Sequence, residues 1–203
     1  MILDAILIAL AAAAAPAIAE LGEREEVDMA LSAAPEHLRA EAGVYRLGRS
    51  GYELVRTSRN GFTCLVSREP NAGTGPQCYD AEGSETTLKR DLLAGKLLRQ
   101  GKTHDEVEAL VSAAYKKGEL AAPRKAGVAY MLSKSFRQVS PKTGRTECIF
   151  PAHVMIYAPY LKNSDIGSTK HFGSVDVPWV LNEGRPDAYI LVVPHNSDVA
   201  GCS

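Results

Sequence analysis

Two residues have the chemistry of a nucleophile and a general base: Cys64 in "FTCLV" and His153 in "PAHVMIYAP". A thiolate is a strong nucleophile, and an imidazole within hydrogen-bond reach can accept the thiol proton. A third polar group would have to orient that imidazole, and His171 and His195 are the candidates. These residue types permit thiol catalysis, provided that Cys64 is a free thiol.

The cysteine count favours a different role for Cys64. The chain has four cysteines, Cys64, Cys78, Cys148 and Cys202. An even number in an exported chain indicates two disulfides, with three possible connectivities. The turn-rich "EPNAGTGPQ" could fold back to pair Cys64 with Cys78, which would leave Cys148 for Cys202. We favour this pairing, because a free Cys64 would leave one of the other three cysteines without a partner.

His153 also has a structural interpretation. A single histidine at the start of an apolar strand is often a rim residue held by one hydrogen bond. The apolar residues on both faces of "HVMIY" predict a central strand that is covered on both sides. His153 is therefore the best polar candidate for a site, whether as a base or as a binding residue.

The sequence gives no sign of a metal or cofactor site. It contains no HExxH, paired CxxC, GxSxG or P-loop motif, and Gly73-Thr74-Gly75 lacks the third glycine of a dinucleotide-binding loop. The histidines are scattered, so we expect no metal and no cofactor; a metal site formed by His153, His171 and His195 is a minor alternative.

Aromatic residues in and near a loop-rich segment, residues 160–187, form a candidate binding surface. Long irregular loops often carry function, and aromatic side chains suit sugar or peptide ligands, although core packing explains them equally well. The candidate binding residues are His153, Tyr157, Tyr160, His171 and Trp179. The dispersed carboxylates Asp165, Asp176 and Asp187 and the basic pair Lys89-Arg90 are expected to be solvated.

The order of "FTCLV", "PRKAGVAYML" and "HVMIY" resembles that of the NlpC/P60 cysteine peptidases. The resemblance implies a cell-wall peptide hydrolase in which Cys64 is the nucleophile and His153 its base. Two features depart from that family. Its cysteine opens a helix and precedes Ser-Gly, whereas Cys64 lies within a predicted strand and precedes Leu-Val.

A second resemblance covers nearly the whole chain after residue 19. The segments "NGFTCLV", "CYDAEG", "APRKAGVAYMLS" and "PAHVMIYAPY" are similar to those of a group of uncharacterised exported bacterial proteins. The resemblance implies a location in the bacterial envelope or outside the cell, but it supplies no activity that could be assigned to any residue.

The first 19 residues have the pattern of a signal peptide. An apolar, alanine-rich run is followed by Pro16 and by the small-x-small triplet Ala17-Ile18-Ala19. We therefore expect residues 1–19 to be removed, residues 20–203 to form one α+β domain, and the protein to be periplasmic or secreted. An uncleaved membrane anchor is the alternative, which the short apolar run disfavours.

The charge of the chain constrains its partners. Apart from Asp4, the chain has 23 acidic and 23 basic residues. A net charge near zero gives no electrostatic attraction to nucleic acid or to anionic lipid. We expect an envelope or extracellular ligand, no nucleic acid, and no membrane span once the signal is removed.

The elements that would position these residues are segregated along the chain. Residues 20–42 predict a charged helix and a short helical turn after Pro35, and "GVYRL", "GYELVRT" and "GFTCLVSR" predict a β-meander. Residues 84–118 predict a helical hairpin, whose second helix starts at the capping box Thr103–Glu106.

The last third returns to strands, "AGVAYMLS", "TECIF", "HVMIYA" and "AYILVVP", of which the first two could form a hairpin about residues 140–144. Segregated helices and strands predict an α+β fold with a mainly antiparallel sheet packed against the helical hairpin. On this basis we expect a binding or accessory protein of the cell envelope, with the NlpC/P60-like hydrolase as the alternative.

Overall fold

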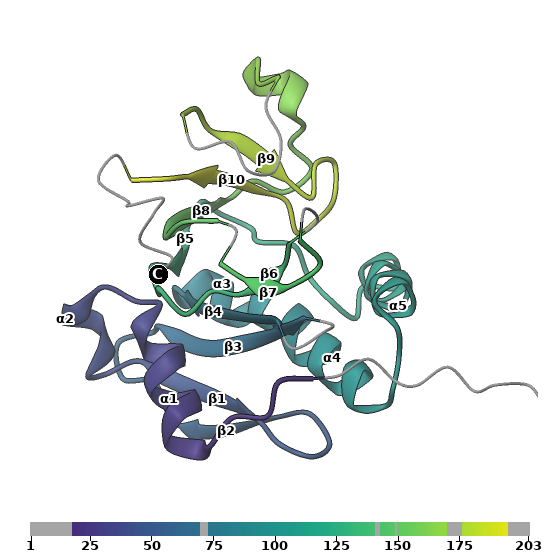
Figure 1. Cartoon of the computed structure of the whole chain (residues 1–203). Coiled ribbons are helices and arrows are strands. Elements are labelled where there is room, and N and C mark those ends of the chain that lie inside the picture. Colours follow the sequence, from purple (N-terminus) through teal and green to yellow (C-terminus); the bar gives the residue numbers. More distant parts are fainter. Residues whose placement is uncertain (1–17, 70–72, 141–142, 149, 170–175, 195–203) are drawn as a thin grey trace, which may run out of the picture.

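The computed structural model describes residues 18–69, 73–140, 143–148, 150–169 and 176–194 (Figure 1). Within these ranges the helices are α1 (Glu23–Ser32), α2 (Glu36–Arg39), α3 (Ala81–Glu85), α4 (Thr87–Arg99), α5 (His104–Lys116) and the 3-10 helix η1 (Asn163–Ile166). The strands are β1 (Gly43–Leu47), β2 (Tyr52–Arg56), β3 (Thr63–Glu69), β4 (Gly73–Tyr79), β5 (Val128–Met131), β6 (Gln138–Val139), β7 (Thr146–Glu147), β8 (His153–Tyr157), β9 (Trp179–Leu181) and β10 (Tyr189–Val192).

Eight of these strands form one sheet, in the order β2-β1-β3-β4-β5-β8-β10-β9, and β6 and β7 form a separate two-stranded ribbon. Among the described strands, β1 and β3 run parallel and the other neighbours in the large sheet run antiparallel. The predicted α+β fold with a mainly antiparallel sheet is confirmed.

The first three strands lie where the sequence predicts them, but they do not form a meander. β2 pairs with β1 at the edge of the sheet, and the chain then crosses to the other side of β1 to form β3. The burial of each strand explains this order. β2 is largely exposed, whereas Cys64, Leu65 and Val66 of β3 are fully buried and need a central position.

β4 is a central strand that the sequence pattern does not predict. Its residues Gly73-Thr74-Gly75 resemble a turn, yet β4 pairs with β3 over seven register positions. A Cβ atom at Gly75 would lie 2.4 Å from Ser67 Oγ, so a larger residue there would force the Ser67 side chain to move. Tertiary packing thus overrides the weak strand propensity of glycine.

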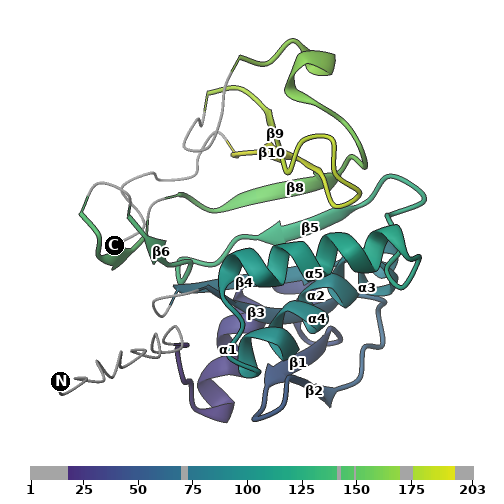
Figure 2. The same ribbon diagram turned by 90° about the vertical axis from the view of Figure 1, so that its right-hand side faces the viewer.

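Helices cover both faces of the N-terminal half of the sheet (Figures 1 and 2). Cys64 and Val66 of β3 pack with Ala30 of α1 and with its C-cap residue Ala33 on one face. Leu65, which alternates with them, belongs to the cluster that includes Leu88 of α4 on the other face. Successive side chains of a strand point to opposite faces of the sheet, so neighbouring residues of β3 pack against different helices.

The predicted helical hairpin is present, and it begins slightly earlier than expected. Asp80 caps α3 by accepting a hydrogen bond from the Gly83 amide at 2.9 Å, and α4 follows after an interruption at Thr86. The capping box of α5 is confirmed, since Thr103 and Glu106 bond each other's backbone amides at 3.3 and 2.9 Å. α5 packs on α4 rather than directly on the sheet.

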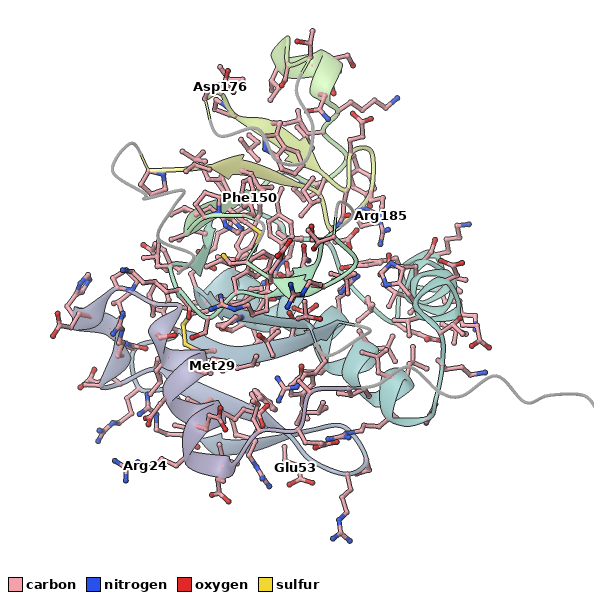
Figure 3. All side chains as sticks on the ribbon, in the orientation of Figure 1. Arg24, Met29, Glu53, Phe150, Asp176 and Arg185 are labelled. Carbon is pink, nitrogen blue, oxygen red and sulfur yellow. A yellow bond between two sulfur atoms is a disulfide. The ribbon has the colours of Figure 1, made fainter. Side chains whose placement is uncertain are left out.

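A disulfide and a buried ion pair reinforce the α1 side. Cys64 is bonded to Cys78 between paired positions of β3 and β4, and the bond is visible beside α1 in Figure 3. Arg68 bonds Glu26 of α1 at 2.7 Å, with both side chains 1% exposed. Cys148 is not a free thiol, and its expected partner Cys202 lies outside the described residues.

The C-terminal strands differ from the sequence prediction in three respects. "TECIF" supplies β7, which pairs with β6 rather than with β5, so the hairpin about residues 140–144 is shorter than expected. β9 lies within the segment predicted to be irregular. β8 is central, but Ile156 on its outer face is 37% exposed, so the described residues cover only one of its faces fully.

The first described residues contact the body of the protein. The carbonyl of Ala19 accepts a hydrogen bond from Arg68 Nε at 3.0 Å, and Ile18 packs against the cluster between α4 and α5. Glu20 forms an ion pair with Arg99. Among the described residues, none of the helices has the length and apolar character that a membrane crossing requires.

Candidate functional site

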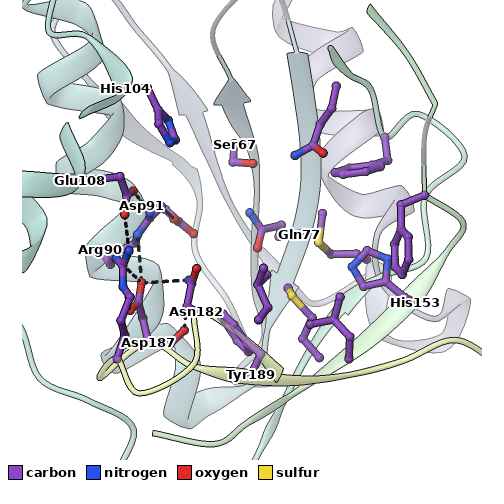
Figure 4. A pocket seen from close by; sticks show the side chains of 18 residues that line it. Ser67, Gln77, Arg90, Asp91, His104, Glu108, His153, Asn182, Asp187 and Tyr189 are labelled. Atoms are coloured by element: carbon purple, nitrogen blue, oxygen red, sulfur yellow. Dashed lines mark hydrogen bonds and ion pairs between the residues drawn. The ribbon is translucent and has the colours of Figure 1, made fainter. Parts of the chain in front are cut away.

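A cleft of about 380 Å³ opens on the sheet face that α4 packs against (Figure 4). β4, β5, β8 and β10 form its floor, α4 and α5 one wall, and the chain around β6 and Phe150 part of the rim. Its volume is at the lower end of the range for small-molecule sites. The lining residues are Ser67, Gln77, Arg90, Asp91, His104, Glu108, Met131, Phe136, Gln138, Phe150, His153, Met155, Leu181, Asn182, Arg185, Asp187, Tyr189 and Leu191.

One end of the cleft is apolar apart from His153. Met131, Met155 and Leu191 lie on adjacent strands, because β5 pairs with β8 and β8 with β10. Phe136 and Phe150 pack against this group from the chain before and after the β6–β7 ribbon. Burial of these side chains holds the ribbon side of the cleft against the sheet.

His153 is the one titratable side chain at this end among the described lining residues. Its ring makes edge-to-face contacts with Phe150 and Phe136, with centroids 4.9 and 6.1 Å away. Its Nδ1 lies 2.8 Å from the carbonyl oxygen of Pro151. Burial lowers the pKa of His153 to about 4, although the hydrogen bond to Pro151 opposes the shift. The imidazole is therefore neutral at physiological pH.

The other end of the cleft is a cluster of five charged residues, Arg90, Asp91, Glu108, Arg185 and Asp187, which we call the ionic cluster. Arg90 bonds Asp91 at 2.9 Å and also bonds Glu108, and its Nε lies 3.6 Å from Asp187. Arg185 bonds both oxygens of Asp187 at 3.0 and 3.2 Å and reaches Glu108 at 2.6 Å. In Figure 4 the cluster lies across the cleft from His153.

Opposite effects set the protonation of the carboxyl groups in the cluster. Burial raises the pKa of Asp91, and Arg90 and a hydrogen bond from Tyr79 oppose that shift. Burial acts in the same sense on Glu108, but Arg90 and Arg185 hold the pKa of Glu108 below its usual value. Asp91 and Glu108, which both bond Arg90, thus have pKa values shifted in opposite directions. Such a difference is also found between the acid and the base of catalytic pairs.

The geometry of the ionic cluster favours a structural role over catalysis. Asp91 already accepts hydrogen bonds from Tyr79 and Arg90, and both oxygens of Asp187 are bonded to Arg185. The cluster joins α4, α5 and the turn between β9 and β10, which are distant in sequence. It therefore fixes the width of the cleft at the helical side.

Two sequence predictions are wrong here. Asp187, expected to be solvated, is 2% exposed, and Arg90, expected at the surface, is partly buried within the cluster. Neither could be recognised from its neighbours in the chain, because their partners lie on other elements. Asp165 and Asp176 are exposed, as expected.

The structure does not bring Cys64 and His153 together. Cys64 faces α1 and is bonded to Cys78, whereas His153 faces the cleft on the opposite side of the sheet. A disulfide sulfur is not a thiolate nucleophile. The NlpC/P60-like dyad is therefore absent from this structure.

Of the other predicted binding residues, those that are described lie outside the cleft lining. Tyr157 is buried and donates a hydrogen bond to the Val128 carbonyl at 2.9 Å. Trp179 is buried and packs edge-to-face on Phe150. Tyr160 is 61% exposed. His171 lies outside the described residues, as does His195 of the minor metal hypothesis.

No family model, curated protein or solved structure matches this chain, so the function has to be inferred from the cleft itself.

Proposed function

We propose that this chain is an exported envelope protein that binds a small molecule in the cleft between His153 and the ionic cluster. The observation that carries the proposal is the cleft itself. It combines an apolar end, one buried neutral histidine and a wall of mutually paired charges. More than half of its described lining residues are polar, and a concave site that sets fixed polar groups beside apolar surface is suited to binding a small molecule.

Export is the second part of the proposal. The signal-like residues 1–19 and the Cys64–Cys78 disulfide support it, because disulfides persist in oxidising compartments. Expression of the full chain in a bacterial host, with fractionation and intact mass analysis, tests it. A processed mass in the periplasm or medium agrees with export, and unprocessed protein confined to the cytosol contradicts it.

The methionines of the chain offer a direct assay for binding. Met131 and Met155 line the cleft, and Met29 lies on α1 at the opposite face of the sheet. Protein labelled with ¹³C at the methionine methyl groups can be titrated with a library of neutral, cationic and anionic fragments. We expect cleft ligands to shift the Met131 and Met155 methyl signals and to leave the Met29 signal in place.

A blocked cleft provides the matched control. Gln138 lies at the rim, so Gln138→Trp should occupy the cleft and reduce fragment affinity at least tenfold. Gln100→Trp introduces the same ring at the exposed C-terminus of α4, outside the cleft, and should have no effect. The binding function is wrong if no fragment in the library shifts the two cleft methyls, or if hits bind the blocked variant equally well.

A further inference from the structure

His153 uses one of its two ring nitrogens in the described structure. Nδ1 lies 2.8 Å from the carbonyl oxygen of Pro151, which can only accept a hydrogen bond. The proton of the neutral ring is therefore on Nδ1, and Nε2 carries a lone pair. Among the described residues no group donates to that lone pair, and His153 lines the cleft.

The surroundings of His153 leave Nε2 as a fixed acceptor. The two phenylalanine rings and the Pro151 carbonyl hold the imidazole, which is 3% exposed. Because the ring cannot rotate without losing these contacts, Nε2 keeps one direction. A ligand that covers Nε2 without donating to it would leave this acceptor unpaired, so a ligand that donates a hydrogen bond to it binds better.

The charged groups on the opposite wall are already paired with one another. Arg185 pairs with Asp187 and Glu108, and Arg90 pairs with Asp91 and Glu108. With three carboxyl groups and two guanidinium groups, the cluster leaves no cation free for an anionic ligand, which would have to displace a carboxylate or enter without a counter-charge, and both cost free energy. The cluster therefore selects against anions.

We propose that the ligand of this cleft is a molecule without an anionic group, that it has an apolar body and one N–H or O–H donor, and that the donor binds Nε2 of His153. The inference rests on the binding function proposed above and names its ligand class. The apolar body would lie on Met131, Met155 and Leu191, and His153 would be the residue that determines specificity.

Four related probes test this directly: indole, 1-methylindole, tryptamine and indole-3-acetate. Indole has the donor and no charge, 1-methylindole lacks the donor, and the last two carry a positive and a negative charge. Titrations followed at the Met131 and Met155 methyls should give an affinity for indole about fivefold higher than for 1-methylindole, as expected for one hydrogen bond. Indole-3-acetate should bind more weakly than both indole and tryptamine.

His153→Phe separates the hydrogen bond from the shape of the site. The variant keeps a ring in place but removes the acceptor, so indole and 1-methylindole should bind it equally. The Met29 methyl signal, on the other face of the sheet, reports whether the variant has folded. The comparison of probes on the unaltered protein needs no variant and stands if His153→Phe does not fold.

Two results would overturn this ligand class. One is equal affinity of the unaltered protein for indole and 1-methylindole; the other is tighter binding of indole-3-acetate than of indole or tryptamine. If library fragments shift the cleft methyls but none of the four probes does, the ligand class is wrong and the binding function stands. If neither the fragments nor the probes shift them, both proposals are wrong.

Discussion

Acidification should destabilise the protein through His153. The pKa of this histidine is about 4 in the folded protein, against 6.5 for an unperturbed group. Between these two values the unfolded chain binds a proton that the folded protein does not, so stability falls as the pH falls from about 6.5 toward 4. The two pKa values correspond to a loss of about 2 kcal/mol between pH 7 and pH 5.

Urea denaturation at pH 7 and pH 5 measures this loss, with His153→Phe as the comparison. Other groups also titrate, including Asp91 and Glu108 across the cleft, but they are present in both proteins and cancel in the difference. The variant should lose about 2 kcal/mol less than the unaltered protein between the two pH values. Its stability at pH 7 can change in either direction without affecting this comparison.

A second histidine, His37 on α2, provides the control. His37→Gln also removes a histidine but leaves the buried imidazole of His153 in place, so it should keep the pH dependence that comes from His153. His153→Leu repeats the test if the phenylalanine variant does not fold. Equal losses in the unaltered protein and the His153 variants would refute the conclusion that burial keeps this imidazole neutral.

Three further predictions concern stability. Glu26→Gln should lower the free energy of unfolding, measured by urea denaturation, by about 3–5 kcal/mol, because it leaves the buried charge of Arg68 without its counter-charge. Replacing both Glu26 and Arg68 with apolar residues should cost less. Replacing Cys64 and Cys78 with alanine should cost roughly 3 kcal/mol and leave fragment affinity for the cleft unchanged; reduced affinity would contradict their separation from the site. A chain that begins just after Ala19 should be about 2 kcal/mol less stable than one that begins at residue 18, because Arg68 loses a carbonyl partner; equal melting temperatures would contradict this.

Features encoded by near neighbours in the chain were predictable from the sequence. The capping box Thr103–Glu106 lies within a single turn of helix, and the structure confirms it. The alternation of Cys64, Leu65 and Val66 likewise follows from the period of a strand. The Cys64–Cys78 pairing was predictable because the connecting segment is short.

Features that depend on distant partners were not predictable. Arg90 and Asp187 look like surface residues because each is flanked by polar or turn-forming neighbours, and their burial depends on contacts across 97 residues of sequence. The glycines of β4 look like a turn in the sequence. Only the packing of Gly75 against Ser67 of β3 shows why glycine occurs in this strand. The sequence identified His153 as the best polar candidate for a site. It did not predict the cleft that His153 faces, because the cleft is formed by helices and strands that are distant in sequence.

The path of the chain through the cleft has a consequence for folding kinetics. Lining residues run from Ser67 on β3 to Leu191 on β10, so the cavity is closed only when the last described strand has paired with β8. If this pairing forms after the rate-limiting step of folding, a ligand of the cleft would lengthen the lifetime of the native state by slowing unfolding, and it would leave the refolding rate unchanged.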